Sequence, residues 1–194
     1  MNEIILASQS PRRKQLLEWA EIPFRVVVPD ADESFPAELE VQKIPIYIAQ
    51  QKVLAVNQLI ANEQSVIGDT IILAADTIVV LGNQVINKPV DRDDAIKILN
   101  SLSARQHQVI TGVVLQKGNI NNSFSVTTQV EFHQLSKTQI EFYVDNYQPY
   151  DKAGAYAIQE WIGVIGIASI TGDFYNVMGL PVSKVVQALH TINL

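Results

Sequence analysis

The sequence contains no cysteine among its 194 residues. A chain without cysteine can form no disulfide, no thiolate zinc site and no cysteine nucleophile. Its three histidines, His107, His133 and His190, do not follow the HExxH pattern or any other zinc-binding spacing. We therefore expect a cytoplasmic location, and any metal chemistry is expected to resemble that of magnesium more than that of zinc.

Long apolar runs are also missing. The longest apolar stretch, Trp161 to Ile170, is about half of the roughly 20 residues that a membrane-spanning helix needs. The N-terminal segment MNEIILASQSPRRK carries its basic residues after its short apolar run, which is the reverse of a secretory signal. We therefore expect neither a membrane anchor nor export.

Positive charge is scarce. Fourteen lysines and arginines face 20 aspartates and glutamates, and the formal net charge is −6. This balance argues against a protein that coats nucleic acid with its general surface. Any anionic ligand must therefore be bound by a local group of basic residues.

The composition is that of a globular domain. Apolar residues make up 47% of the chain and charged residues 18%, so neither a disordered nor a linker-like composition fits. A chain of 194 residues is long enough to bury a substantial core within one domain. We expect a single domain over residues 1–194, in which two lobes can be accommodated.

Helical and strand-like patterns follow one another along the chain and predict an α/β fold, a mixed sheet flanked by helices. Strands are expected over residues 4–7, 24–29, 107–118 and 122–135, and within 65–89, where Gly82-Asn83 resembles a hairpin turn. Helices are expected over residues 12–20 after Ser10-Pro11, over 44–60, 91–103 and 136–147, and after Pro181. Segments 107–118 and 122–135 alternate like strands of a partly antiparallel sheet.

Asp76 is the most informative single residue, because it interrupts the apolar run from Ile71 to Leu81. An unpaired buried carboxylate is costly. Backbone amides or a lysine could hold Asp76 at a strand end, or it could lie in a cleft as a general base or metal ligand. Thr77 would point to the opposite face of a regular strand.

Asp32 and Glu33 form a second acidic pair, in a loop between two predicted elements. Such a pair is most often a solvated turn. Together with Asp76, either residue could also supply the hard oxygen ligands that Mg²⁺ prefers, with substrate phosphates completing the coordination shell. The sequence does not choose between Asp32 and Glu33.

Five basic residues lie close to turns or element ends: Arg12, Arg13, Lys52, Lys88 and Lys152. Each is by default a surface charge. Arg12 and Arg13 occupy the first turn of a predicted helix, where the helix dipole favours anions, so a bound anion would offset their repulsion. No Walker loop and no GxGxxG segment after a strand is present. These residues indicate a polyanion site with a hard metal.

Six short motifs occur in order along the chain. They are Ser8-Gln9-Ser10-Pro11-Arg12-Arg13, Ala75-Asp76-Thr77, Lys88-Pro89, Thr111-Gly112-Val113, Lys152-Ala153-Gly154-Ala155-Tyr156 with Gln159, and Gly179-Leu180-Pro181. In order and spacing they closely resemble the Maf family of nucleotide pyrophosphatases, also called septum formation inhibitors. The resemblance covers essentially the whole chain.

The resemblance implies a fold related to the inosine triphosphate pyrophosphatases, elongated and with a cleft between two lobes. It implies that Asp76 is the catalytic proton acceptor and that Mg²⁺ or Mn²⁺ is bound by Glu33 and Asp76. The implied phosphate-binding residues are Ser8, Arg13, Lys52 and Lys88, and the implied specificity residues are Arg12, Thr77 and Gln159.

The specificity residues separate two branches of the family. The branch that resembles 7-methyl-GTP pyrophosphatases carries Trp, Gln and Glu at the positions of Arg12, Thr77 and Gln159. This chain resembles the other branch, which hydrolyses dTTP and UTP to the monophosphate and pyrophosphate. It departs from the family pattern at Ser103-Ala104-Arg105 and at Glu160-Trp161, which bears on loop shape and base choice.

The sequence also allows two other functions. A non-catalytic regulator of cell division would bind a nucleotide or a protein, but Asp76 and Glu33 would then have no chemical role. A nucleic-acid-binding protein would use Arg12 and Arg13 on backbone phosphates, but the acidic balance opposes it. The expected partner is a nucleoside triphosphate, without nucleic acid or membrane, and a homodimer is one of the states that the sequence allows.

Overall fold

The computed structural model describes residues 3–28, 30–62 and 70–193. The strands are β1 (Ile4–Leu6), β2 (Phe24–Val26), β3 (Ile71–Leu81), β4 (Gln84–Ile86), β5 (Gln106–Lys117), β6 (Ile120–Phe132) and β7 (Ile167–Thr171). The helices are α1 (Pro11–Trp19), α2 (Ile44–Asn62), α3 (Arg92–Leu102), α4 (Lys137–Tyr147), α5 (Trp161–Gly166), α6 (Phe174–Met178) and α7 (Val182–Asn193). Short 3₁₀ turns are η1 (Val41–Lys43), η2 (Pro149–Asp151) and η3 (Ala153–Ala155).

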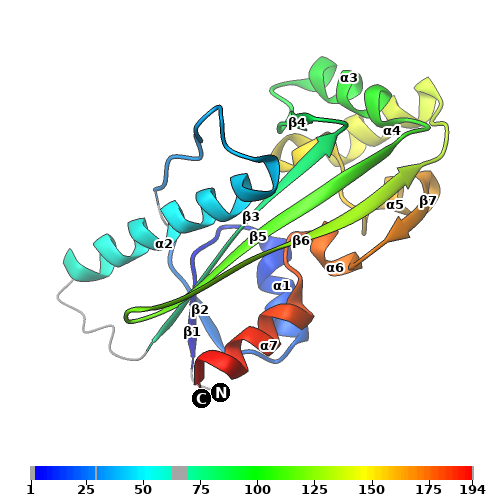
Figure 1. The fold of residues 1–194 in the computed structure, drawn as a ribbon. Coiled ribbons are helices and arrows are strands. Elements are labelled where there is room, and N and C mark those ends of the chain that lie inside the picture. The colour runs from blue at the N-terminus through cyan, green and yellow to red at the C-terminus, as the bar shows by residue number, and fades with distance from the viewer. Residues whose placement is uncertain (1–2, 29, 63–69, 194) are drawn as a thin grey trace. The chain divides into compact units, whose positions relative to one another are not determined.

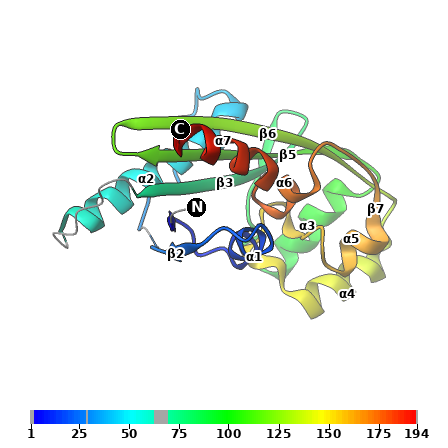
Figure 2. The ribbon, with the colours of Figure 1, turned by 90° about the horizontal axis from the view of Figure 1, so that it is seen from below.

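The strands form one seven-stranded sheet in the order β2-β1-β3-β5-β6-β7, with β4 paired to β3 (Figure 1). The pairs β1–β2 and β1–β3 are parallel, whereas β3–β4 and β6–β7 are antiparallel. Strands β5 and β6 run side by side (Figure 2). The predicted α/β class, a mixed sheet flanked by helices, is confirmed.

The chain divides into two compact units. The first unit contains residues 1–76, 111–126 and 179–194, and the second contains 77–110 and 127–178. Strands β3, β5 and β6 each contribute residues to both units. The single-domain description and the cleft between lobes stay predictions.

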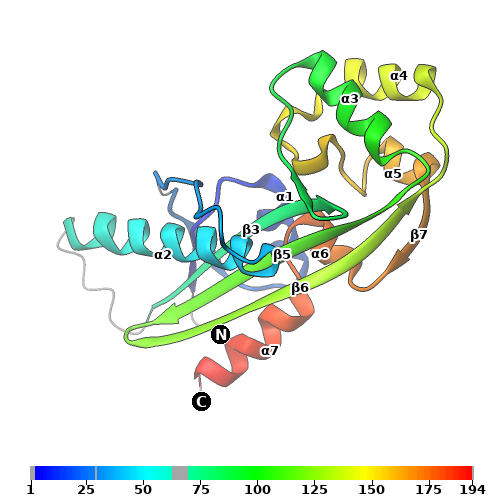
Figure 3. The same ribbon diagram turned by 45° about the horizontal axis from the view of Figure 1, so that its top comes forward.

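In the first unit, α2 packs against β1, β3 and β5 and runs along the strands (Figures 1 and 3). The core between them contains Ile5, Ala7, Ala49, Val53, Val56, Ile60, Ile72, Ala74 and Val114. Gly112 allows the closest approach, because a Cβ atom there would overlap the backbone of Pro45 and Ile46. This packing fixes the position of α2 beside β3 and gives the glycine of the Thr111-Gly112-Val113 motif a physical role.

In the second unit, α3 packs beside α4 (Figure 3). Asp91 caps α3, and Ser136 forms a capping box with Gln139 at the start of α4, so both predicted helix starts are confirmed. Arg92 and Asp145 join the two helices by a bidentate ion pair with N–O distances of 2.6 and 2.9 Å. That hydrogen bonding lowers the pKa of Asp145 and raises the pKa of Arg92.

The predicted hairpin turn is also confirmed, because Leu81 pairs with Gln84 across Gly82 and Asn83. Gly82 has a φ of 62°, which suits a two-residue hairpin loop. The predicted strand over 24–29 is shorter in the structure, where β2 ends at Val26. The apolar stretch from Trp161 to Ile170 is divided between α5 and β7. Among the described residues, no helix combines the length and apolar character needed to cross a membrane.

Candidate active site

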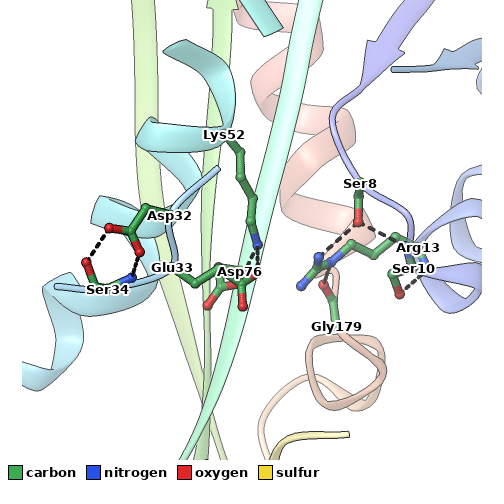
Figure 4. Close-up of polar contacts among 9 residues, drawn as sticks. All are labelled: Ser8, Ser10, Arg13, Asp32, Glu33, Ser34, Lys52, Asp76 and Gly179. Atoms are coloured by element: carbon green, nitrogen blue, oxygen red, sulfur yellow. Dashed lines mark hydrogen bonds and ion pairs between the residues drawn. The ribbon is translucent and has the colours of Figure 1, made fainter. Parts of the chain in front are cut away.

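The loop between β1 and α1 positions Arg13. Ser10 caps α1 by accepting a hydrogen bond from the Arg13 backbone N–H, and Pro11 begins the helix. The Arg13 side chain turns inward, where Nε donates to the carbonyl of Gly179 at 2.8 Å and Nη1 donates to Ser8 Oγ at 3.1 Å (Figure 4). We call Ser8, Arg13 and Gly179 the arginine cluster.

Arg13 is 8% exposed, so the default expectation of a surface charge was wrong for this residue. Burial lowers the pKa of Arg13, while the nearby carboxylate of Asp76 acts in the opposite direction. A guanidinium keeps its charge in proteins, so Arg13 is a buried, fixed cation. Ser8 is buried as well and also accepts a hydrogen bond from the Ser10 N–H at 3.2 Å.

Helix α2 places Lys52 beside two carboxylates. Its Nζ lies 2.7 Å from Asp76 Oδ1 and 2.8 Å from Glu33 Oε1, and Figure 4 shows both carboxylates meeting at the ammonium group. The exposed fractions of the side chains are 11% for Lys52, 13% for Asp76 and 48% for Glu33. We call these three residues the lysine–carboxylate cluster. The surface-charge expectation was therefore wrong for Lys52 too.

The cluster shows how β3 tolerates an acidic residue. Asp76 is 9% exposed, as the interrupted apolar run predicted, and Lys52 compensates its charge within hydrogen-bond distance. Of the alternatives for Asp76, a lysine partner is the one that the structure shows directly. A paired carboxylate can still act chemically, because Lys52 contacts Oδ1 and a second carboxylate oxygen remains on Asp76.

The acidic pair in the loop divides into two roles. Asp32 accepts hydrogen bonds from the backbone N–H and the hydroxyl of Ser34, at 2.8 and 2.7 Å, and these bonds lower the pKa of Asp32. Glu33 instead contacts Lys52. Of the two acidic residues, Glu33 is the one that approaches the same ammonium as Asp76 (Figure 4), and its role as a metal ligand stays a prediction.

A divalent metal would need oxygen donors close together. Within residues 3–28, 30–62 and 70–193, no group of three or more histidine, cysteine or acidic residues could by itself hold an ion. One oxygen of Glu33 and one of Asp76 contact the same Lys52 ammonium, at 2.8 and 2.7 Å. Mg²⁺ is often held by one or two carboxylates plus water and substrate phosphates. Glu33 and Asp76 supply two such carboxylates, with the Lys52 ammonium between the oxygens described.

The remaining predicted residues differ in exposure. Arg12, in the first unit, and Thr77, in the second, are half-buried. Lys88 and Gln159, both in the second unit, are exposed. The structure thus brings Ser8 to Arg13 and brings Lys52, Asp76 and Glu33 together.

Gln159 occupies the tip of a turn in the second unit. The Glu160 N–H donates to the carbonyl of Ala157 at 3.1 Å, so Ile158 and Gln159 are the central residues of that turn. Both residues line a hollow of about 490 Å³. Its other lining residues are Gly163, Val164, Ile167, Ala168, Ser169, Ile170 and Phe174.

The sequence analysis named Gly179 and Lys152 but did not predict their contacts, and the surface-charge expectation was wrong for Lys152, which is buried. Gly179, part of a quoted motif, supplies the carbonyl that accepts from Arg13, and its φ of 115° explains the glycine. Lys152 is buried between Asp151 and Glu160. The cost of burying an unpaired cation was the one signal that could have predicted a carboxylate near Lys152, but not which one.

Together, the mixed sheet, the arginine cluster and the lysine–carboxylate cluster define an α/β protein that buries charged side chains in both clusters. The chain belongs to the Maf family, since the family model described as "Maf-like protein" matches residues 3–192.

Curated relatives agree over nearly the whole chain. A protein of Cytophaga hutchinsonii named "dTTP/UTP pyrophosphatase" is 49% identical over 187 residues, 96% of this chain and 83% of the relative. A protein of Bacteroides thetaiotaomicron with the same name is 47% identical, over 96% of this chain and 94% of the relative. One from Porphyromonas gingivalis, also so named, is 44% identical, over 96% of this chain and 92% of the relative.

Proposed function

We propose that this protein is a nucleoside triphosphate pyrophosphatase that hydrolyses dTTP and UTP to the monophosphate and pyrophosphate. The observation that carries the proposal is the lysine–carboxylate cluster, in which a buried strand aspartate meets a lysine and a second carboxylate. The names of relatives that are 44% to 49% identical support the reaction and the substrates.

Asp76 is assigned as the proton acceptor. It accepts a proton from a water molecule whose oxygen attacks the α-phosphorus, and the bond from that phosphorus to the bridging oxygen breaks. The electron pair of that bond leaves with pyrophosphate. Lys52 holds the Asp76 carboxylate through Oδ1 at 2.7 Å, so the other oxygen is assigned to the water.

The phosphate chain is assigned to Ser8, Arg13, Lys52 and Lys88. Arg13 is oriented by its hydrogen bonds to Ser8 and Gly179 before any ligand binds. Such preorganisation lowers the cost of binding the transition state, and a planar guanidinium suits phosphate oxygens. Lysine adds a point charge at Lys52 and at Lys88.

Mg²⁺ or Mn²⁺ is assigned to Glu33 and Asp76. When bound, the metal would neutralise negative charge on the phosphates and on the departing pyrophosphate. The protein would supply the two carboxylates, which lie 2.7 Å (Asp76) and 2.8 Å (Glu33) from the Lys52 ammonium.

Base choice is assigned to Arg12, Thr77 and Gln159. The amide of Gln159 can donate and accept at once, as the edge of a pyrimidine requires. A cytoplasmic location, a homodimer, the absence of nucleic acid as a partner and any effect on septum formation are proposals that rest on the sequence and on the family resemblance.

The direct test is product analysis with dTTP, UTP, dCTP, dATP and 7-methyl-GTP in the presence of Mg²⁺ or Mn²⁺. We expect dTTP and UTP to be preferred and to yield the monophosphate and pyrophosphate. A diphosphate nucleoside with orthophosphate as the main products would overturn the reaction. Nucleotide binding without turnover would favour the non-catalytic regulator instead.

A further inference from the structure

The turn that carries Gln159 runs from Ala157 to Glu160 and is held at both ends. Ala157 and Ile158 are buried, whereas Gln159 is exposed at the tip. An exposed side chain on a fixed turn can be aimed at a ligand. The contacts that hold this turn therefore determine the position of the Gln159 side chain.

One buried hydroxyl joins the two ends of the turn. Tyr143 on α4 is fully buried, and its hydroxyl accepts a hydrogen bond from the Ala157 N–H at 3.2 Å. The same hydroxyl donates to Oε2 of Glu160. The other oxygen of Glu160 lies 3.6 Å from Nζ of Lys152. Tyr143 therefore contacts the first and last residues of the turn at once.

The start of α5 fixes the turn from another side. The backbone N–H groups of Gly163 and Val164 donate to the carbonyl of Glu160 at 2.9 and 3.2 Å. A Cβ atom on Gly163 would overlap the carbonyl of Ile158. The turn thus lies directly against the first turn of α5, which leaves its backbone little freedom.

We propose that Tyr143 and Glu160 are positioning residues for base selection, which set the place of the Gln159 amide. The inference rests on the proposed function, because it assumes that Gln159 meets the base. Hydrogen bonds are strongly directional, and a site that pairs with a base edge discriminates only while its polar groups stay in place. Both residues act on the turn and neither belongs to the lysine–carboxylate cluster.

The first test is Tyr143→Phe, which removes only the hydroxyl. We expect KM for dTTP and UTP to rise roughly tenfold while kcat stays within about threefold, so that the preference over dCTP falls by a similar factor. The matched control is Tyr147→Phe, whose ring stacks on Tyr143 at a centroid distance of 5.0 Å. The control should leave KM and the preference unchanged.

A second pair of variants keeps the inference testable if Tyr143→Phe does not fold. Glu160→Ala removes the acceptor of the Tyr143 hydroxyl, whereas Glu160→Gln retains a carbonyl oxygen that can accept it. We expect Glu160→Ala to lose the base preference and Glu160→Gln to recover much of it. Unchanged preference in folded Tyr143→Phe and Glu160→Ala, or an equal fall in kcat for all substrates, would overturn the inference.

Binding measurements separate this inference from the proposed reaction. If the parent protein shows no turnover, the proposed reaction is contradicted. The positioning role of Tyr143 can then still be tested by measuring nucleotide affinity. Trp161 follows Glu160 and contacts Phe142 at a ring-centroid distance of 4.7 Å, so its fluorescence can report on the turn in a Trp19→Phe background. We expect tighter binding of dTTP than of dCTP by the parent and nearly equal binding by Tyr143→Phe. The same ratio in both proteins would refute the positioning role.

Discussion

Lys52 in the first unit and Lys152 in the second are both buried lysines held between two carboxylates. Their side chains are 11% and 9% exposed. Lys52 lies 2.7 Å from Asp76, which is itself buried in β3. Lys152 lies 2.8 Å from Asp151, which is 58% exposed, and 3.6 Å from Glu160. The close partner is thus a buried carboxylate in one case and a solvated one in the other.

From this difference we expect a catalytic role for the Lys52 pair and a structural role for the Lys152 pair. Around Lys152, the less exposed carboxylate is that of Glu160, which also accepts a hydrogen bond from the Tyr143 hydroxyl. The backbone carbonyl of Glu160 accepts the first hydrogen bonds of α5. Around Lys52, the inner carboxylate Asp76 has a second carboxylate beside the same ammonium and lies near the charge of Arg13. Buried ion pairs are weak evidence of stabilisation in general, so their surroundings decide what each does.

The largest expected effect is that of Asp76→Asn, compared with Asp151→Asn. Asparagine keeps the shape of Asp76 but cannot accept a proton from water, so kcat should fall by roughly 10²- to 10⁴-fold while nucleotide binding remains measurable. Asp151→Asn changes the matching carboxylate beside Lys152 and should keep kcat within about threefold. Steady-state kinetics at saturating metal and substrate check both. If Asp76→Asn also stays within about threefold, Asp76 has a structural role only.

The next effect concerns the lysines themselves. Lys52→Met removes a preorganised positive charge next to Asp76, and we expect kcat to fall roughly 10²-fold. Lys152→Met should lower the free energy of unfolding by about 1–3 kcal/mol, because the partly buried carboxylate of Glu160 loses its cationic partner, while kcat is retained. Urea unfolding and kinetics on both variants distinguish the two outcomes. Similar losses of kcat in both variants would contradict the expectation that only Lys52 has a catalytic role.

A third test extends the comparison to a neutral buried pair. His107 in the second unit is 2% exposed, and its Nε2 lies 2.7 Å from the hydroxyl of Tyr156. Burial lowers the pKa of His107 from 6.5 to about 4 and raises the pKa of Tyr156. Below pH 6.5 the unfolded chain therefore binds a proton that the folded protein excludes. The stability contributed by neutral His107 is lost as the pH falls from 6.5 towards 4.

The expected loss from His107 is about 3 kcal/mol across that window. Urea unfolding as a function of pH measures it, with His107→Gln as the comparison, since glutamine retains hydrogen-bonding groups but does not titrate. The variant should lose less stability than the parent between neutral pH and pH 4. Parallel pH profiles for the two proteins would show that His107 does not titrate in this range.

The sequence predicted features that depend on neighbouring residues better than features that depend on distant ones. Asp76 stood out because an acidic residue within an apolar strand is costly, and Ser10 and Ser136 marked helix starts through local capping. The burial of Arg13 could not be predicted, because its acceptor, Gly179, is 166 positions away along the chain. Family motifs indicated that these residues matter, but not how they contact one another.

Short apolar runs were ambiguous for a different reason. The run from Trp161 to Ile170 becomes helix and then strand at Gly166, where a Cβ atom would lie 3.0 Å from Leu135 and 3.3 Å from Phe132. Periodicity over so few residues cannot separate the two structures. The link from Tyr143 to the turn at Gln159 likewise depends on how α4 packs, which no local pattern reveals.

The smallest expected effect distinguishes Glu33 from its neighbour Asp32. Glu33 is 48% exposed and lies 2.8 Å from Lys52, whereas Asp32 is bonded to Ser34 in the same loop. Glu33→Gln keeps the shape of the side chain but removes one of two converging negative charges. We expect the concentration of Mg²⁺ or Mn²⁺ for half-maximal activity to rise roughly tenfold, with kcat at saturating metal nearly unchanged.

Asp32→Asn is the control for Glu33→Gln, because it changes the adjacent carboxylate without touching Lys52. Its metal requirement should match that of the parent. Titrating activity with Mg²⁺ and Mn²⁺ at fixed dTTP gives both values. If Asp32→Asn raises the requirement and Glu33→Gln does not, the assignment of the two residues is reversed. A shift in neither variant would mean that Asp76 and the substrate phosphates hold the metal without Glu33, and that Glu33 serves only as a partner of Lys52.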